Sequence, residues 1–439
     1  MIISKLLAFL KNIVQSRLEI ELKGNHTDIP CYVKEEMDNS ELPEFIRKYN
    51  LSDPEIVTLL LALVPHISSG FFTNIIQEYL PNGGEFPEFG GVKGKNHRGI
   101  LPTGETVLFI LAGNNPEQRN ELSGLFSEDH FFAQKGVLYL EEVPAGEPRM
   151  SGKLIMDQEY VDLFTTGLVS KPKLNSDFPA QFIETNLEWD DLILNKKTSS
   201  QIAEIETWLK YNDVLFNDWG MKNRIKPGYR VLFTGPPGTG KTFTASLLGK
   251  YTNRDVFRID LSLVISKYIG ETEKNLSKLF DRAKNKNWIL FFDEADAIFG
   301  KRTNIRDAHD KYANQEVSYL LQRIESHAGL VILASNLKNN IDSAFTRRFN
   351  SIIEFENPSA EERLMLWKKN IPPTVKLDEI IVLEDLAMKY EVNGANIVNI
   401  IHYACLKTIE SNSTTICYRD ILSGIQKEYV KEGKMINLN

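Results

Sequence analysis

An eight-residue stretch in the C-terminal half of the chain has the residue types and spacing of a phosphate-binding loop. It follows an apolar run, Arg230–Thr234, and consists of Gly235, Pro236, Pro237, Gly238, Thr239, Gly240, Lys241 and Thr242. The glycines allow a backbone curl whose N–H groups face a phosphate chain, and a following helix adds the positive end of its dipole. Lys241 would pair with the β and γ phosphates, and Thr242 would offer a hydroxyl to Mg²⁺. The alternative is an ordinary glycine-rich turn.

A pair of carboxylates, Asp293 and Glu294, follows a second apolar run at Ile289–Phe292. Ligands bind beyond the carboxyl ends of the strands in parallel sheets, so we expect this pair beside the phosphate loop. Asp293 would hold Mg²⁺ through water next to Thr242, and Glu294 would orient and polarise an attacking water. The alternative is a strand that runs into an acidic, solvated turn.

Polar residues beside two further strands complete the set. Asn336 ends the stretch VILASN, where its side chain can hydrogen-bond the attacking water or the γ-phosphate, although Asn is also favoured in turns. Arg347 and Arg348 stand just before the last strand of the series. They form either a solvated edge or a pair of arginine fingers that reach the γ-phosphate held by a neighbouring subunit.

A sheet is needed to position these residues, and the apolar runs predict one. Runs of four to six residues alternate with helical stretches at Arg230–Thr234, Val256–Asp260, Ile289–Phe292, Val331–Ala334 and Ile352–Phe355. Such alternation predicts an α/β fold with a parallel sheet covered by helices on both faces. Beyond Pro358 we expect no further strands, and the stretches from EERLMLWKKNI to YRDILSGIQKEYV indicate a small helical domain.

The N-terminal part of the chain is predicted to be a mixed α+β region. ISKLLAFLKNIVQSRL and DPEIVTLLLALVPHI have helical spacing, and Pro54 stands near the start of the second helix, where a missing N–H costs least. GETVLFILAG and KGVLYLEEV are predicted as short strands. The glycine- and proline-rich residues 82–102 indicate a loop or domain boundary, and residues 171–186 indicate a linker.

Four domains are therefore expected along the chain. They are a helical N-terminal region at residues 1–85, a small α+β region with a linker at 86–186, a large α/β domain at 187–357 and a helical domain at 358–439.

Charge and composition narrow the possible functions. The chain carries 51 Lys and Arg against 59 Asp and Glu, and residues 1–186 hold 26 acidic against 16 basic residues. Binding to duplex nucleic acid needs a basic surface, so a nucleic-acid partner is not favoured. The longest apolar run, Ile56–Val64, is too short for a membrane span, and the N-terminus is typical of an amphipathic helix instead of a signal peptide. Three scattered cysteines without ligand spacing favour a reducing cytoplasm.

Taken together, GPPGTGKT, ILFFDEAD, LASN and the Arg347–Arg348 pair resemble the AAA clade of the AAA+ ATPase superfamily over about residues 187–439. The resemblance implies a five-stranded α/β domain with a C-terminal helical lid, and homohexameric rings that hold ATP and Mg²⁺ between subunits. It implies that Asp293 and Glu294 are the Walker B pair and that Asn336 is sensor 1. The two arginines match the fingers that act on the neighbouring subunit's nucleotide.

A candidate substrate-gripping loop is also implied by this resemblance. Tyr268, Ile269 and Gly270 are similar to the family's first pore loop, which faces the central channel of the ring. An aromatic side chain on a short exposed loop can grip polypeptide without sequence preference. The alternative is a buried Tyr that packs under the following helix.

In the expected lid, Gly394 and Ala395 match positions whose backbone packs near the base and sugar of the nucleotide, as the resemblance implies. Asn396 stands where many members of the clade have Asp, and a sensor 2 arginine is absent, as is usual in the clade. The stretches TNIRDAHDKYANQEVSYLLQRIE, FGGVKGKNHRG and LPTGET resemble a bacterial subgroup. That subgroup includes the ATPases encoded with extracellular contractile injection systems.

Three functions are compatible with these residues. The first is an ATP-hydrolysing cytoplasmic oligomer that remodels, unfolds or disassembles a protein substrate. The second is a ring that uses its nucleotide state as an assembly switch without threading substrate, and the third is a nucleic-acid motor. Intact Lys241 and Glu294 favour turnover, while the acidic balance and the aromatic of the candidate pore loop favour a protein substrate over nucleic acid.

Overall fold

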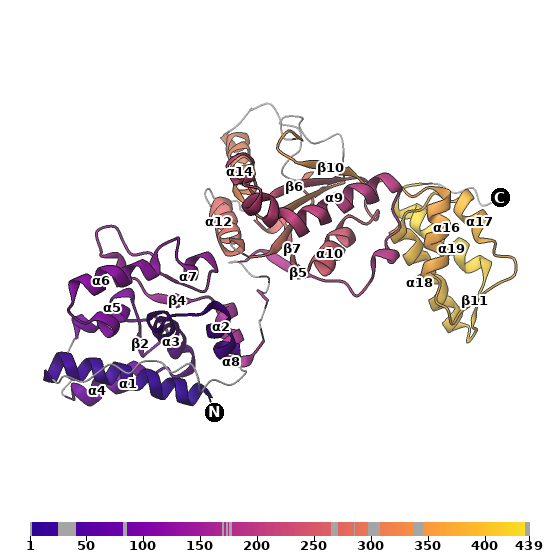
Figure 1. Ribbon diagram of the computed structural model, residues 1–439. Coiled ribbons are helices and arrows are strands. Elements are labelled where there is room, and N and C mark those ends of the chain that lie inside the picture. Colours follow the sequence, from indigo (N-terminus) through magenta and orange to yellow (C-terminus); the bar gives the residue numbers. More distant parts are fainter. Residues whose placement is uncertain are drawn as a thin grey trace. The chain divides into compact units, whose positions relative to one another are not determined.

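The computed structural model describes residues 2–24, 41–81, 86–168, 171–172, 174, 178–264, 271–284, 286–296, 308–336 and 346–434. The contacts between residues divide the chain into two compact units, Met1–Lys171 and Pro172–Asn439. Both units contain helices and strands (Figure 1).

The N-terminal unit is built mainly from helices. These are α1 (Ile2–Lys23), α2 (Glu41–Tyr49), α3 (Asp53–Ile67), α4 (Phe71–Tyr79), α5 (Gly104–Ala112), α6 (Pro116–Ser123), α7 (Phe131–Gln134) and α8 (Gln158–Thr166), with short turns η2 (Pro87–Phe89), η3 (Gly124–Phe126) and η4 (Arg149–Ser151). Two antiparallel strand pairs join them, β1 (Val92–Lys93) with β2 (Ile100–Leu101) and β3 (Leu138–Leu140) with β4 (Leu154–Met156). The helices expected around Pro54 and in the N-terminal stretch are confirmed.

One hydrophobic core runs through this whole unit. Leu59 of α3, Phe89 of η2, Phe109 of α5 and Phe132 of α7 are all fully buried in the same cluster. Residues on both sides of the boundary expected between 85 and 86 therefore share a core, and Phe89 places the glycine-rich segment inside the unit.

The stretch GETVLFILAG was predicted as a strand, and this prediction is wrong, because it forms α5. A capping box starts the helix: Thr103 Oγ1 accepts from the Thr106 N–H at 3.3 Å, and Thr106 Oγ1 accepts from the Thr103 N–H at 3.0 Å. Val107–Ile110 are buried on every side. A helix that is buried all round shows no alternation of polar and apolar residues, so its sequence cannot be told from that of a buried strand. The capping box at Thr103 and Thr106 is the local signal that indicates a helix.

Within the described ranges, no helix by itself has the length and apolar composition to cross a membrane. The pair α3 and α4 meets that test only when taken together, and the two helices are bent by 104°.

The second unit contains a six-stranded sheet in the order β10-β6-β9-β8-β7-β5. Its strands are β5 (Ala180–Ile183), β6 (Tyr229–Thr234), β7 (Asp255–Asp260), β8 (Trp288–Asp293), β9 (Leu330–Ser335) and β10 (Ser351–Glu354). The five strands predicted from the apolar runs are present and run parallel. The α/β fold class is confirmed.

The count of five strands needs a correction, because β5 adds an antiparallel edge strand. Its residues lie in the segment expected to be a linker, and Ala180 pairs with Ile259 of β7. Phe178, just before β5, is fully buried and lies edge-on to Phe257 and Trp288. Burial of this aromatic side chain favours the pairing of a segment too short to show a strand pattern.

Helices cover both faces of the sheet (Figure 1). One layer contains α9 (Lys196–Asp213) and α10 (Lys241–Thr252), and the other contains α11 (Leu261–Val264), α12 (Glu271–Ala283) and α14 (Ala308–Ser326). Side chains of β8 alternate between two cores, with Ile289 and Phe291 in one and Leu290 and Phe292 in the other. Short turns η5 (Trp189–Asp191), η6 (Val214–Asp218) and η7 (Met221–Asn223) flank α9. Burial on both faces explains why β8 is apolar throughout.

The C-terminal segment forms a small helical domain, as expected. It contains α16 (Ala360–Asn370), α17 (Leu383–Lys389), α18 (Gly394–Glu410) and α19 (Tyr418–Lys431), packed around the fully buried Trp367. The expectation that strands end at Pro358 is wrong in detail. A parallel pair joins β11 (Lys376–Leu377) to β12 (Thr415–Ile416), and two residues per strand are too few for a sequence pattern.

Candidate active site

Three strands deliver the candidate residues to one edge of the sheet. β9 lies between β6 and β8, with Thr234 of β6 beside Ser335 and Phe292 of β8 beside Leu333. The strands are parallel, so their carboxyl ends stop at nearly the same level. The segments that follow Thr234, Asp293 and Ser335 therefore meet at this edge, where parallel sheets bind their ligands.

The loop between β6 and α10 closes tightly and depends on glycine. Gly235 has φ +139°, and a Cβ built on it would lie 2.0 Å from the carbonyl oxygen of Phe355. The curl ends at Gly240, which is the N-cap of α10. The N-terminus of this 12-residue helix therefore points its free N–H groups and positive dipole end toward the loop.

Lys241 is the first residue of α10 and is only 7% exposed. Its ammonium donates to the carbonyl oxygens of Gly235 at 2.7 Å and Pro236 at 2.8 Å. Burial lowers the pKa of Lys241 to about 8, and the carboxylates of Asp293 and Asp296 oppose that shift. The ammonium is thus held inside the loop, in a place where an anion would stabilise its charged form.

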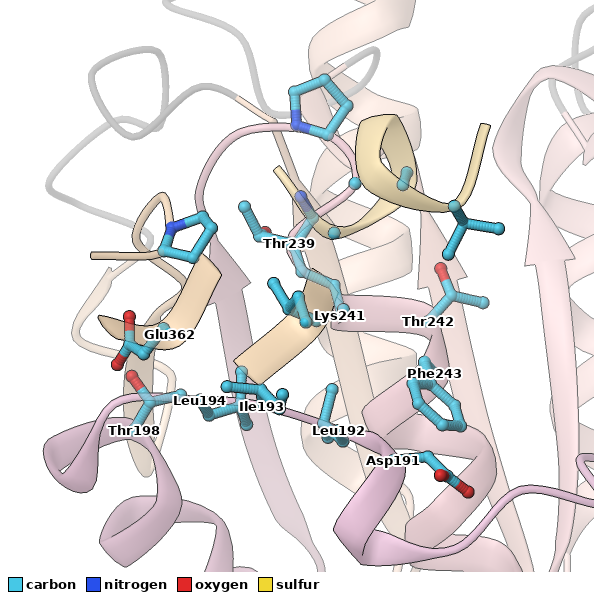
Figure 2. Close-up of a pocket in the computed structure, with 18 of the residues that line it drawn as sticks. Asp191, Leu192, Ile193, Leu194, Thr198, Thr239, Lys241, Thr242, Phe243 and Glu362 are labelled. Atoms are coloured by element: carbon cyan, nitrogen blue, oxygen red, sulfur yellow. The ribbon is translucent and has the colours of Figure 1, made fainter. Parts of the chain in front are cut away.

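The loop forms one wall of a cavity of about 660 Å³. Figure 2 shows Leu192, Ile193 and Leu194 in a row opposite the loop segment that carries Thr239 and Lys241. The predicted loop residues that line the cavity are Pro237, Gly238, Thr239, Gly240, Lys241 and Thr242. The cavity wall also includes Asp293, Glu294 and Asn336, so the structure brings the three predicted groups together around one space.

The two carboxylates differ in their surroundings. Asp293 ends β8, and its Oδ2 lies 2.9 Å from Nη2 of Arg258 on the neighbouring strand β7. Glu294 is exposed and has a left-handed backbone with φ +53°. Its N–H donates to Asp293 Oδ1 at 3.0 Å. A non-glycine residue rarely adopts this conformation, and such residues are concentrated at functional sites.

Asn336 directly follows β9 and is exposed at the cavity. Its backbone N–H lies 3.3 Å from Oδ1 of Asp296, and the Ala295 N–H donates to the Ala334 carbonyl at 2.8 Å. These contacts tie the segment after β8 to the end of β9, so Asn336 and Glu294 hold a defined relation to each other.

Arg347 and Arg348 precede β10 and are exposed. Neither is among the residues that line the cavity of its own chain. Arg348 instead pairs with Glu325 of α14, with 2.6 Å between Nη1 and Oε1. The structure therefore keeps the two arginines apart from the loop and carboxylates that it brings together.

The lid reaches the phosphate loop through the start of α18. Asn393 Nδ2 donates to the Pro237 carbonyl at 3.2 Å, and the Ala395 N–H lies 3.4 Å from the Gly238 carbonyl oxygen. Gly394 and Ala395 line the cavity as expected. The lid helices thus form part of the wall around the loop.

Several wall residues had no role in the sequence-based prediction. They are Asp191, Leu192, Ile193, Leu194, Glu362, Leu366, Lys369, Asn370 and Val398. The signal that marks Leu192, Ile193 and Leu194 is the apolar run LIL just before the helix cap Asn195, whose side chain accepts from the Thr198 N–H at 2.8 Å.

The candidate pore-loop residues Tyr268, Ile269 and Gly270 lie outside the described residues. The flanking elements are described: α11 ends at Val264 and α12 begins at Glu271.

Residues 231–357 match the sequence profile of the ATPase family associated with various cellular activities (AAA). The chain is 32% identical over 210 residues to an uncharacterized AAA family ATPase of Sinorhizobium fredii, covering 47% of this chain and 61% of that protein. It is 35% identical over 211 residues to the proteasome-activating nucleotidase of Methanoregula boonei, covering 46% of this chain and 48% of the relative. A cell division cycle protein 48 homolog of Archaeoglobus fulgidus is 30% identical over 221 residues, or 48% of this chain and 29% of that protein. The matched segment spans less than two thirds of each relative.

Proposed function

Residues 231–357 form an ATPase domain of the AAA family, and on this premise we propose that the chain hydrolyses ATP to ADP and phosphate and couples this to work on a protein substrate. The observation that carries the proposal is that Lys241, Thr242, Asp293 and Glu294 all line the same cavity. A triphosphate requires a cation and N–H donors for its charge, and hydrolysis requires a carboxylate near its end.

The residues present fit both ATP and Mg²⁺. The Thr242 hydroxyl and the Asp293 carboxylate are hard oxygen donors of the kind that Mg²⁺ takes, and both line the cavity. Mg²⁺, when bound, neutralises charge on the phosphates. The apolar side chains of Leu192, Ile193 and Val398 line the same cavity and offer a surface for an adenine ring.

In this proposal, the chain contributes mainly positioning and charge. Lys241 and the N-terminus of α10 bind the phosphates, Glu294 orients and polarises the attacking water, and Asn336 hydrogen-bonds that water or the γ-phosphate. The left-handed backbone at Glu294 supports this role, because non-glycine residues held in this conformation are concentrated at functional sites and Glu294 lines the cavity.

We also propose that the active form is a homohexamer assembled with ATP and Mg²⁺. Arg347 and Arg348 do not line their own chain's cavity, so as arginine fingers they would serve a neighbouring subunit. The similarity to a relative named proteasome-activating nucleotidase supports a protein as the substrate. Tyr268 would grip that substrate, and the cytoplasm is the proposed location.

An assembly switch without threading is the second candidate, because arginines supplied by a neighbour would make assembly depend on nucleotide even without substrate movement. An association with a contractile injection system belongs to the proposal as well. It is supported by the resemblance of FGGVKGKNHRG and LPTGET to that bacterial subgroup.

The test is ATP hydrolysis by the purified chain, compared with its Glu294→Gln variant. We expect the variant to retain ATP binding and to lose at least about 100-fold in kcat, as for removal of a positioned base. Mass spectrometry of proteins that co-purify with this variant would identify the substrate. A wild-type chain that neither binds nor hydrolyses ATP would refute the proposal. A Tyr268→Ala variant that keeps both ATPase and biological activity would show that the chain does not thread substrate through Tyr268, and would favour the assembly switch.

A further inference from the structure

Asn396 uses both ends of its side-chain amide in buried contacts. It is the third residue of α18 and is 8% exposed. Its Oδ1 accepts from the Asn393 N–H at 3.0 Å, and its own N–H donates to Asn393 Oδ1 at 2.9 Å. Its Nδ2 donates to Oε2 of Glu428 on α19 at 2.9 Å. This side chain is both an acceptor toward its own helix cap and a donor toward a carboxylate.

Glu428 is an unusual partner because it is a buried carboxylate, 5% exposed. Burial is the largest single effect on its pKa and raises it, but hydrogen bonds from Lys431, Asn396 and Asn399 outweigh burial and lower the pKa overall. Asn399 Nδ2 lies 3.4 Å from Oε2, and Lys431 binds the other carboxylate oxygen at 2.5 Å. Glu428 is therefore held ionised, and it requires donors on the side that faces α18.

The cap that Asn396 completes is also the point where the lid contacts the phosphate loop. Asn393 donates through Nδ2 to the Pro237 carbonyl, and the Ala395 N–H approaches the Gly238 carbonyl. Gly238 leaves no room between them, because a Cβ on it would lie 2.6 Å from Asn393 Oδ1. A shift of the α18 N-terminus would therefore displace the loop that carries Lys241.

We propose that Asn396 and Glu428 are a positioning pair that sets the start of α18 against the phosphate loop, and that Glu428 requires an uncharged donor at position 396. The inference rests on the proposed ATPase function, since its readout is nucleotide binding at that site. It also gives a physical reason for Asn at a position where many members of the clade have Asp. Two carboxylates at 2.9 Å repel each other, and one of them ionises only at a raised pKa.

The test is a charge-exchange cycle on the full-length chain. Asn396→Asp, Glu428→Gln and the double variant are compared for their dissociation constant with a fluorescent, non-hydrolysable ATP analogue and Mg²⁺ at pH 7.5. Circular dichroism fixes a temperature at which all four proteins are folded. We expect Asn396→Asp to weaken binding at least about tenfold, which corresponds to about 1.4 kcal/mol. Glu428→Gln should bind within about twofold of wild type, and the double variant should recover binding, because Gln at position 428 can donate to the new carboxylate.

A pH series adds a signature that a general folding defect would not produce. In Asn396→Asp, the new carboxylate faces Glu428, whose other neighbours are Lys431 on α19 and Asn399 on α18. As pH falls from 7.5, the carboxylate pair would come to share a proton, so the affinity ratio between wild type and variant should shrink. The double variant, which lacks one carboxylate, should show no such change in its ratio to wild type.

Two results would overturn the inference. Asn396→Asp that binds the analogue like wild type would show that the pair does not position the loop, even if its melting temperature fell. Weak binding that Glu428→Gln fails to restore would show that the carboxylate contact is not the cause. A wild-type chain that does not bind the analogue would refute the proposed function itself, and the inference with it.

Discussion

Arg348 and Glu325 are hydrogen-bonded within one chain, with 2.6 Å between Nη1 and Oε1. Glu325 is itself fixed: the buried Arg230 donates through Nη1 to its carbonyl oxygen at 3.1 Å. Arg230 also donates through its backbone N–H and Nε to Oδ1 of Asn350, two residues after Arg348. Both arginines are exposed, but among the described residues Arg348 has an ion pair, with Glu325, and Arg347 has none. The two arginines are not equivalent.

The first prediction assigns them different roles. Under the proposed function, Arg347→Ala should lower kcat for ATP hydrolysis about 10³-fold and keep ATP binding, as for loss of an arginine finger. Arg348→Ala should lower kcat by about tenfold or less, because its main contact is within its own chain. Glu325→Gln is the matched control and should resemble Arg348→Ala. A steady-state assay in which Arg348→Ala is as inactive as Arg347→Ala, with Glu325→Gln normal, would show that both arginines act as fingers and would contradict the assignment.

The second prediction concerns the pH dependence of nucleotide binding. Burial lowers the pKa of Lys241 to about 8, and phosphate bound beside it would favour the charged form. Binding should therefore take up a proton above pH 8, and affinity for an ATP analogue should fall from pH 8 to 9.5, by up to tenfold per unit. Titration calorimetry in two buffers of different ionisation enthalpy measures this proton. Lys241→Ala should bind weakly and lose the dependence, whereas a flat wild-type profile would contradict the prediction.

The third prediction concerns acid stability. His327 is 9% exposed at the end of α14, and burial, followed by the charge of Arg323, lowers its pKa to about 4. The unfolded state therefore binds a proton between pH 6.5 and 4 that the folded state does not. The free energy of unfolding should fall by up to roughly 3 kcal/mol as pH falls through that window. Urea unfolding of wild type and His327→Gln at pH 7 and 4.5 should show a smaller loss for the variant. Equal losses would exclude His327 as the cause.

The fourth prediction compares two glycines with left-handed backbones. Gly238 has φ +77° and lies against Asn393 and Ala395, while Gly220 has φ +65° and open space around it. Gly220→Ala should lower the free energy of unfolding by about 1–2 kcal/mol through backbone strain alone and leave ATP binding unchanged. Gly238→Ala adds a clash with the lid and should also weaken binding of an ATP analogue at least about tenfold. Equal affinities for the two variants would contradict the lid contact.

The sequence predicted the central sheet well because its strands are buried on both faces. A strand such as β8 has no polar position to interrupt it, and the phosphate loop and carboxylates follow directly in the chain. The same property misled the prediction at α5, where Val107–Ile110 are also buried on every side. In both β8 and α5 the apolar residues indicate burial and not the type of secondary structure. The Thr103–Thr106 capping box is what distinguishes the helix.

Features set by distant partners were not predictable from local pattern. β5 is a strand because it pairs with β7, and the apolar wall at Leu192–Leu194 is defined by the loop opposite it. The contact of Arg258 with Asp293 depends on the register between β7 and β8. Asn396 departs from the motif that many members of the clade have. Its amide donates to the Glu428 carboxylate, 32 residues away in the sequence, and local pattern does not show that contact.

The antiparallel edge strand has a mechanical consequence. The second unit begins at Pro172, and its first strand is β5, whose four residues are paired with β7 just after the buried Phe178. Tension transmitted along the chain from the N-terminal side would therefore reach the second unit's sheet through that four-residue pairing and the buried Phe178 beside it. β7 leads through α11 into the segment that holds Tyr268. A load on the tether and a load on the candidate gripping loop would thus converge on one pair of neighbouring strands.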